Sequence, residues 1–215
     1  MAFLFQLFSL PLLLWFSPNA SEAELIKKDF SAALMPKTEL LGFIGEDKQR
    51  IYIQFNTIYK DSTNALLYHI IGNTTVKGNR CDFKGSLRVR DLELISGTKD
   101  SLVGRISGKY YFTENPNQQH VGIFEGQFWA LWLSPDGEVI EYHNAKVSSD
   151  EYRNNQYEGI WTEYGAKDVK MCNWGEHRIP QSGDLDIGAA EFSANPKYKD
   201  QGWWWLLPLT DNLFD

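Results

Sequence analysis

Residues 50–59, which read RIYIQFNTIY, decide the fold class of this 215-residue chain. Side chains of a strand point alternately to its two faces, so every second residue shares a surface. Here one face is mostly apolar or aromatic and the other is more polar, which predicts a strand with one buried side. The first face carries Ile51, Ile53, Phe55, Thr57 and Tyr59, and the second carries Tyr52, Gln54 and Asn56.

Similar segments follow along the chain, most of them ending in polar turn residues. The alternation in the third segment slips near Asp91, as a β-bulge would cause. Seven or eight short strands with almost no helix between them predict an antiparallel all-β fold, either a barrel or a sandwich. The further segments are 65–76, 81–95, 102–114, 121–133, 138–147, 156–164 and a shorter one at 169–174.

A repeated glycine pattern favours the barrel over the sandwich. Four strands contain an apolar residue two positions before and two positions after a glycine, namely Gly85, Gly108, Gly126 and Gly159. Glycine weakens a strand unless a bend or a close approach requires it, and closing a small barrel requires such bends. We therefore predict one antiparallel barrel of seven or eight strands. Its bulky apolar residues are expected to fill the interior and leave at most a shallow pocket at one end.

The two ends of the chain differ from this central region. Residues 1–23 hold an apolar run and then Ser21-Glu22-Ala23, which predicts a cleaved signal peptide, although no Lys or Arg precedes the run. An uncleaved membrane anchor is the alternative. A short helix is expected over 24–35, stopped by Pro36. The barrel domain would span 24–207, with an irregular C-terminal wrap after Gly175 and a loose tail at 208–215.

The charge and the cysteine content limit which partners and which cellular compartment we expect. The formal net charge of −7 argues against nucleic acid and anionic lipid as partners, and a membrane contact is expected only if the N-terminal segment stays attached. The two cysteines, Cys81 and Cys172, predict one disulfide in an exported chain, with two buried free thiols as the alternative. The expected location is periplasmic or secreted.

The C-terminal region resembles a known family. Residues 172–180, CNWGEHRIP, and residues 184–193, DLDIGAAEFS, are similar to the ending of a family of uncharacterised exported bacterial proteins, and the resemblance covers residues 45–203. It implies export and a β-rich fold but no activity. The predicted barrel is also similar in outline to the calycins, which bind small ligands, although a Gly-x-Trp signature is missing near the first strand.

Motifs for phosphate-binding loops, serine-nucleophile elbows and zinc sites do not occur in the sequence, and nothing in it indicates a cofactor or a metal. Polar and aromatic residues that could bind a ligand crowd one loop-rich stretch. In the alternative, Arg178 pairs with the nearby carboxylates and the stretch only seals one barrel end. The candidate binding residues are Trp174, Glu176, His177, Arg178, Asp184 and Asp186.

These observations favour an exported, non-enzymatic binding protein. Its ligand would be a protein, a glycan or a small apolar molecule. Two alternatives stay open at this point: a hydrolase that uses acidic residues and His177, and an envelope-associated structural protein.

Overall fold

The computed structural model describes residues 20–98, 101–144, 153–189 and 191–204. Most of the predicted signal peptide and the predicted loose tail lie outside these residues. Within them, no helix is long and apolar enough to span a bilayer.

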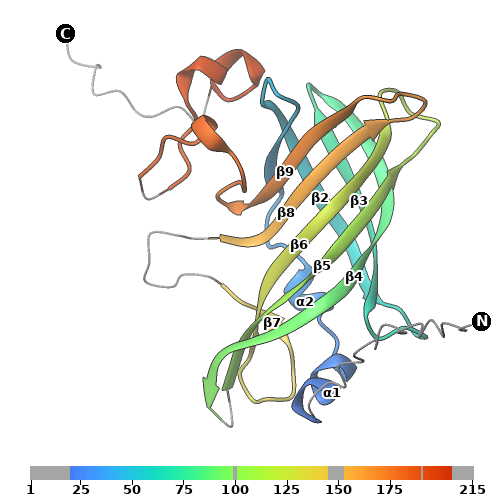
Figure 1. Ribbon diagram of the computed structural model, residues 1–215, viewed down its shortest axis with the longest axis vertical. Helices are drawn as coiled ribbons and strands as arrows, with labels where there is room; N and C mark the ends of the chain where they lie inside the picture. The colour runs from blue at the N-terminus through green and yellow to red at the C-terminus, as the bar shows by residue number, and fades with distance from the viewer. Residues whose placement is uncertain (1–19, 99–100, 145–152, 190, 205–215) are drawn as a thin grey trace, which may run out of the picture.

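Eight antiparallel strands close into a barrel (Figure 1), which confirms the predicted fold class. Each strand pairs with the one before it in the list below, and β9 pairs with β1 to close the ring. The strands are β1 (Leu40–Ile44), β2 (Gln49–Lys60), β3 (Leu67–Val76), β4 (Asn79–Thr98), β5 (Ser101–Glu114), β6 (Gly122–Ser134), β8 (Arg153–Glu163) and β9 (Val169–His177).

Two strand predictions need correction. β1 was not predicted, because its LLGFI sequence is apolar on both faces and lacks the alternation of a half-exposed strand. The segment predicted at 138–147 contributes only β7 (Glu141–Tyr142), which pairs with β6 outside the ring, and its last residues lie outside the described part.

The structure departs from regular strand geometry at one of the predicted glycines and at the predicted bulge. Gly126 of β6 faces Gly159 of β8, and a Cβ atom at Gly126 would lie 2.1 Å from the Glu158 carbonyl oxygen. The two strands therefore approach more closely than larger residues would allow. The β4–β5 register shifts between Val89 and Asp91, at the predicted bulge.

Aromatic side chains fill the middle of the barrel. Tyr157 and Trp174 stack with ring centroids 5.3 Å apart and planes inclined by 13°, and most other pairs meet at steeper angles, an arrangement that aromatic quadrupoles favour. This part of the interior is filled, as expected. The cluster comprises Phe55, Phe83, Tyr110, Phe112, Phe124, Phe128, Tyr157 and Trp174.

The N-terminal segment closes one end of the barrel. Instead of the single helix predicted over 24–35, the chain forms α1 (Ala20–Lys27) and α2 (Ser31–Leu34). The Asp29 carboxylate accepts hydrogen bonds from the backbone N–H and the hydroxyl of Ser31, a local turn that interrupts the helix. Phe30 then packs edge-on against Trp132, with ring centroids 5.6 Å apart.

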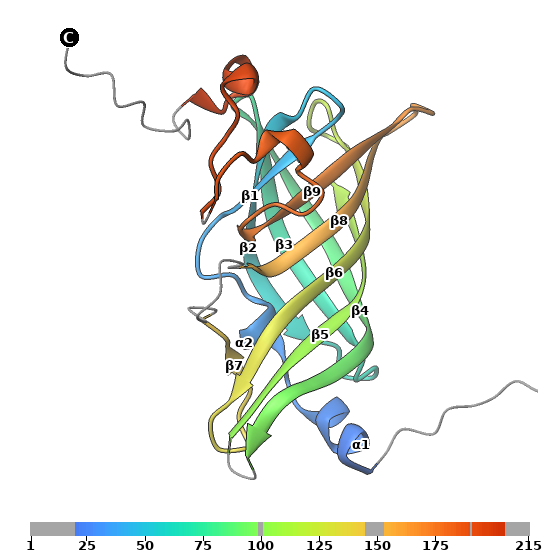
Figure 2. The same cartoon turned by 60° about the vertical axis from the view of Figure 1, so that its left-hand side comes forward.

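The C-terminal segment wraps around the outside of the barrel, next to β1 and β9 (Figure 2). It contains two short 3₁₀ helices, η1 (Gly183–Leu185) and η2 (Pro196–Gln201). Trp203 is fully buried in a second apolar cluster with Phe43 of β1, and its indole N–H donates to the Lys48 carbonyl over 2.7 Å. This cover explains why β1 is apolar on both faces.

The predicted disulfide between Cys81 and Cys172 is wrong: both cysteines are free and buried. Cys81 lies on β4 and Cys172 on β9. In the closed ring, three strands separate β4 from β9 on either side, so the two cysteines lie on opposite walls of the barrel. A disulfide needs Cα atoms within about 7 Å of each other, a condition that opposite walls of a filled barrel do not meet.

Candidate functional site

The predicted binding residues at the end of the chain are engaged with one another and with their own loop. The Arg178 guanidinium pairs with the Asp186 carboxylate at 2.7 Å and also donates to the carbonyls of Gly188 and Ala189. Asp186 in turn accepts from the backbone N–H groups of Gly188 and Ser193. Both charged side chains are largely covered, so this pair organises the wrap.

The other residues of that set lie in different places. Trp174 is fully buried among the core aromatics. Glu176 is buried near the plugged end, where it accepts from the Tyr142 hydroxyl and the Asn155 amide. Asp184 forms an ion pair with Lys197 on the surface.

His177 is exposed at the C-terminal end of β9, the end opposite the β8–β9 turn. The six residues do not gather around one cleft. Their role in binding stays a prediction. The Arg178–Asp186 pair is the one that the alternative expected, but the stretch lies along the outside of the barrel and does not seal an end.

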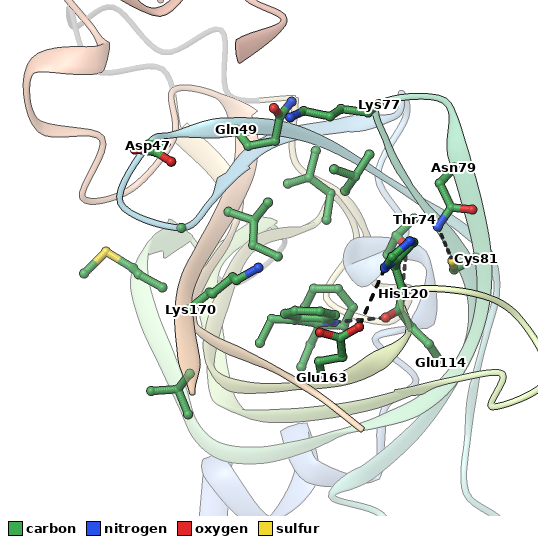
Figure 3. A pocket seen from close by; sticks show the side chains of 18 of the residues that line it. Asp47, Gln49, Thr74, Lys77, Asn79, Cys81, Glu114, His120, Glu163 and Lys170 are labelled. Atoms are coloured by element: carbon green, nitrogen blue, oxygen red, sulfur yellow. Dashed lines mark hydrogen bonds and ion pairs between the residues drawn. The ribbon is translucent and has the colours of Figure 1, made fainter. Parts of the chain in front are cut away.

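A pocket of about 860 Å³ opens at the opposite end of the barrel (Figure 3). The turns between β1 and β2, β3 and β4, β5 and β6, and β8 and β9 surround it. It is larger than the shallow pocket expected from the sequence, because three of its inward residues, Thr74, Val76 and Cys81, are small. Its apolar walls are formed mainly by Ile44, Ile51, Val76, Phe124 and Trp161.

A buried carboxyl group lies in this pocket. Glu114, the last residue of β5, is 3% exposed. It accepts hydrogen bonds from the Thr74 hydroxyl at 2.6 Å, the Gly122 backbone N–H at 2.9 Å and the Trp161 indole N–H at 3.0 Å. Burial raises the pKa of Glu114, against the opposing effect of these three donors.

Charged side chains approach the pocket from its other walls. The Lys170 ammonium lies 5.2 Å from the centroid of the Trp161 ring, in the range of a cation–π contact. His120 and Glu163 approach to 3.7 Å between Nδ1 and Oε1. In Figure 3, Lys170 and His120 reach toward the pocket from opposite sides.

Cys81 borders the same pocket and accepts a hydrogen bond from the Asn79 amide at 3.3 Å. Burial raises the pKa of its thiol, so the reactive thiolate form is disfavoured near neutral pH. A thiol in this state is a poor nucleophile.

Sequence reasoning missed Glu114, although a signal was present. The residue follows Tyr110 and Phe112 at every second position, so it lies in phase with the inward face of its strand. An acidic residue in that phase, just before a turn, indicates a carboxyl group at the mouth of a barrel.

The fold and site thus define a closed eight-stranded barrel that is plugged at one end and hollow at the other. Comparisons of the chain with protein-family models, curated proteins and solved structures gave no match. The resemblance to exported bacterial proteins and to calycins therefore stays a prediction.

Proposed function

We propose that this protein binds a small molecule in the mouth of its barrel, as an exported binding protein without catalytic activity. The single observation that carries the proposal is the open pocket of about 860 Å³. Ligand sites are concave, mostly apolar spaces of about 300–1,000 Å³ with a few convergent polar groups. The mouth fits this description, with apolar walls around Glu114 and Thr74.

The site favours this function over the two alternatives. A hydrolase that depends on His177 would need that residue near the pocket, but it lies at the opposite end of β9 from the mouth. A purely structural protein would have no use for a hollow mouth in a barrel whose middle is filled with aromatic rings. Export rests on residues 1–23 and is tested by the N-terminal sequence of the protein recovered from a periplasmic or culture fraction.

Titration with a neutral fluorescent probe, N-phenyl-1-naphthylamine, tests the binding function. We expect saturable binding at one site. Val76→Trp places an indole in the pocket and should weaken binding at least tenfold. Ile71→Trp is the matched control, because Ile71 lies on the same strand but is 40% exposed outside the barrel, and it should leave binding unchanged. Lack of saturable binding, or equal binding by the two folded variants, would overturn the proposal.

A further inference from the structure

We infer that the natural ligand carries a positively charged nitrogen attached to an apolar body, and that this nitrogen pairs with Glu114. The inference rests on the proposed function and names the class of ligand. It covers apolar amines and quaternary ammonium compounds, which share a compact cation and an apolar substituent.

The first support is the environment of Glu114. Its three donors fix the orientation of the carboxyl group but use only three of about four acceptor positions that a carboxylate offers. Among the described residues, none forms an ion pair with it. Buried carboxylates in proteins are normally paired with a cation. A ligand ammonium would favour the ionised form of Glu114 and pair with it from the open side of the pocket.

The second support is Trp161, which joins an aromatic face to this carboxyl group. Its indole N–H donates to Glu114, while its ring already has the Lys170 ammonium nearby. The ring borders the pocket and already attracts one cation, so a ligand ammonium that reaches it would replace the Lys170 ammonium there. Indole rings are the strongest aromatic partners for cations, including quaternary ammonium groups.

The third support is the balance of charge around the pocket. Four carboxyl groups line it, those of Glu46, Asp47, Glu114 and Glu163, and its lysines are Lys77 and Lys170. His120, the remaining basic group in the lining, already approaches Glu163. An anionic ligand would have to enter against this excess of acid, whereas a cation is attracted by it.

Three ligands with the same eight-carbon chain test the inference: octylammonium, octanol and octanoate, titrated calorimetrically at pH 7. We expect octylammonium to bind at least tenfold more tightly than octanol, and octanoate to bind most weakly. Glu114→Gln should remove the preference for octylammonium and leave the affinity for octanol unchanged. Glu125→Gln is the control, since Glu125 is an exposed residue of β6 outside the pocket, and it should change nothing.

The outcomes separate this inference from the proposed function. Equal affinities for octylammonium and octanol would overturn the inference of a cationic ligand and leave the pocket as a site for neutral molecules. An unaltered preference for octylammonium in Glu114→Gln would overturn the pairing of the ligand with Glu114. Tightest binding of octanoate, lost in Lys170→Met, would replace the cation with an anion. Failure of the naphthylamine probe to bind would instead refute the pocket itself. If Glu114→Gln does not fold, the ranking of the three ligands on the unaltered protein decides the question.

Discussion

The two ends of this barrel are built from the same strands but have opposite characters. At the plugged end, Phe30 and Leu34 from the N-terminal segment are buried against barrel residues such as Trp132. At the mouth, the inward positions of β3 and β4 carry small residues such as Thr74 and Cys81, and the turns leave the space above them open. How far a barrel interior is filled therefore depends on the size of its inward residues and on segments from outside the strands. The number of strands alone does not determine it.

Two buried glutamates express the same contrast. Glu176, near the plugged end, accepts from Tyr142, Asn155 and the backbone N–H of Lys37, so it ties strands and N-terminal segment together. Glu114 at the mouth is held equally firmly, but it borders an open pocket. The first carboxyl group is enclosed by protein groups, whereas the second borders the pocket in which we propose that a ligand binds.

The largest effect is expected from Phe30→Ala, which would open the plugged end. Removing a fully packed phenylalanine should lower the free energy of unfolding by about 3–5 kcal/mol. Val76→Ala at the mouth, where there is already space, should cost only about 1 kcal/mol. Denaturant unfolding of the two variants measures the difference, and equal losses would contradict the contrast between the two ends.

A smaller loss is expected from Glu114→Leu. This change leaves the Thr74 hydroxyl, the Gly122 N–H and the Trp161 N–H without their acceptor. We expect a loss of about 1–3 kcal/mol, limited by water that can enter the pocket. Glu114→Gln should avoid this loss, because its amide can accept from two of the donors and donate to the Thr74 oxygen. A leucine variant as stable as the glutamine variant would show that the three hydrogen bonds contribute little.

The sequence predicted the barrel because alternation and glycine bends are local properties of each strand. β5 shows the period of two over most of its length, and the glycines mark where neighbouring strands approach. In β2 the period holds from Ile51 to Phe55, after which a bulge turns Ile58 inward and leaves Tyr59 exposed, against the prediction. β1 was not predicted from the sequence, because the burial of its outer face depends on Trp203, about 160 residues later in the chain. A tertiary contact at that distance leaves no local pattern.

The site was harder to predict because it depends on how strands are arranged around the ring. Counting cysteines could not reveal that Cys81 and Cys172 face each other across the barrel. The sequence shows that polar residues cluster around Arg178, but it does not determine that Arg178 pairs with Asp186. Glu114 carried the more informative signal, a carboxyl group in phase with inward aromatics.

The pH dependence of the free energy of unfolding tests whether the pKa of Glu114 is raised. Burial raises its pKa in the folded protein above that in the unfolded chain. The stability that its neutral form contributes is then complete below the unfolded pKa and is lost as the pH rises through the folded pKa. Glu114→Gln should therefore gain stability relative to the unaltered protein as the pH rises from the unfolded pKa of Glu114 through its raised folded pKa, by less than the loss in the leucine variant. Unfolding curves across this range measure the gain, and a constant difference would show that Glu114 keeps its ordinary pKa.

Added reductant is expected to have no effect on stability at all. A disulfide between Cys81 and Cys172 would close a loop of about 90 residues and add about 4–5 kcal/mol in the chain-entropy model. Because the two thiols lie on opposite walls, dithiothreitol should leave the thermal midpoint unchanged, and denatured protein should show two reactive thiols before any reduction.

The thiols also report on the two regions of the barrel interior separately. Burial raises the pKa of both, most strongly that of Cys172, which is fully enclosed beside the core aromatics. Cys81 borders the pocket. In the native protein a small maleimide should therefore label Cys81 before Cys172, and N-phenyl-1-naphthylamine in the mouth should slow the first reaction only. Equal labelling rates would mean that both thiols become accessible only when the whole barrel unfolds, and that the mouth is no more open than the core.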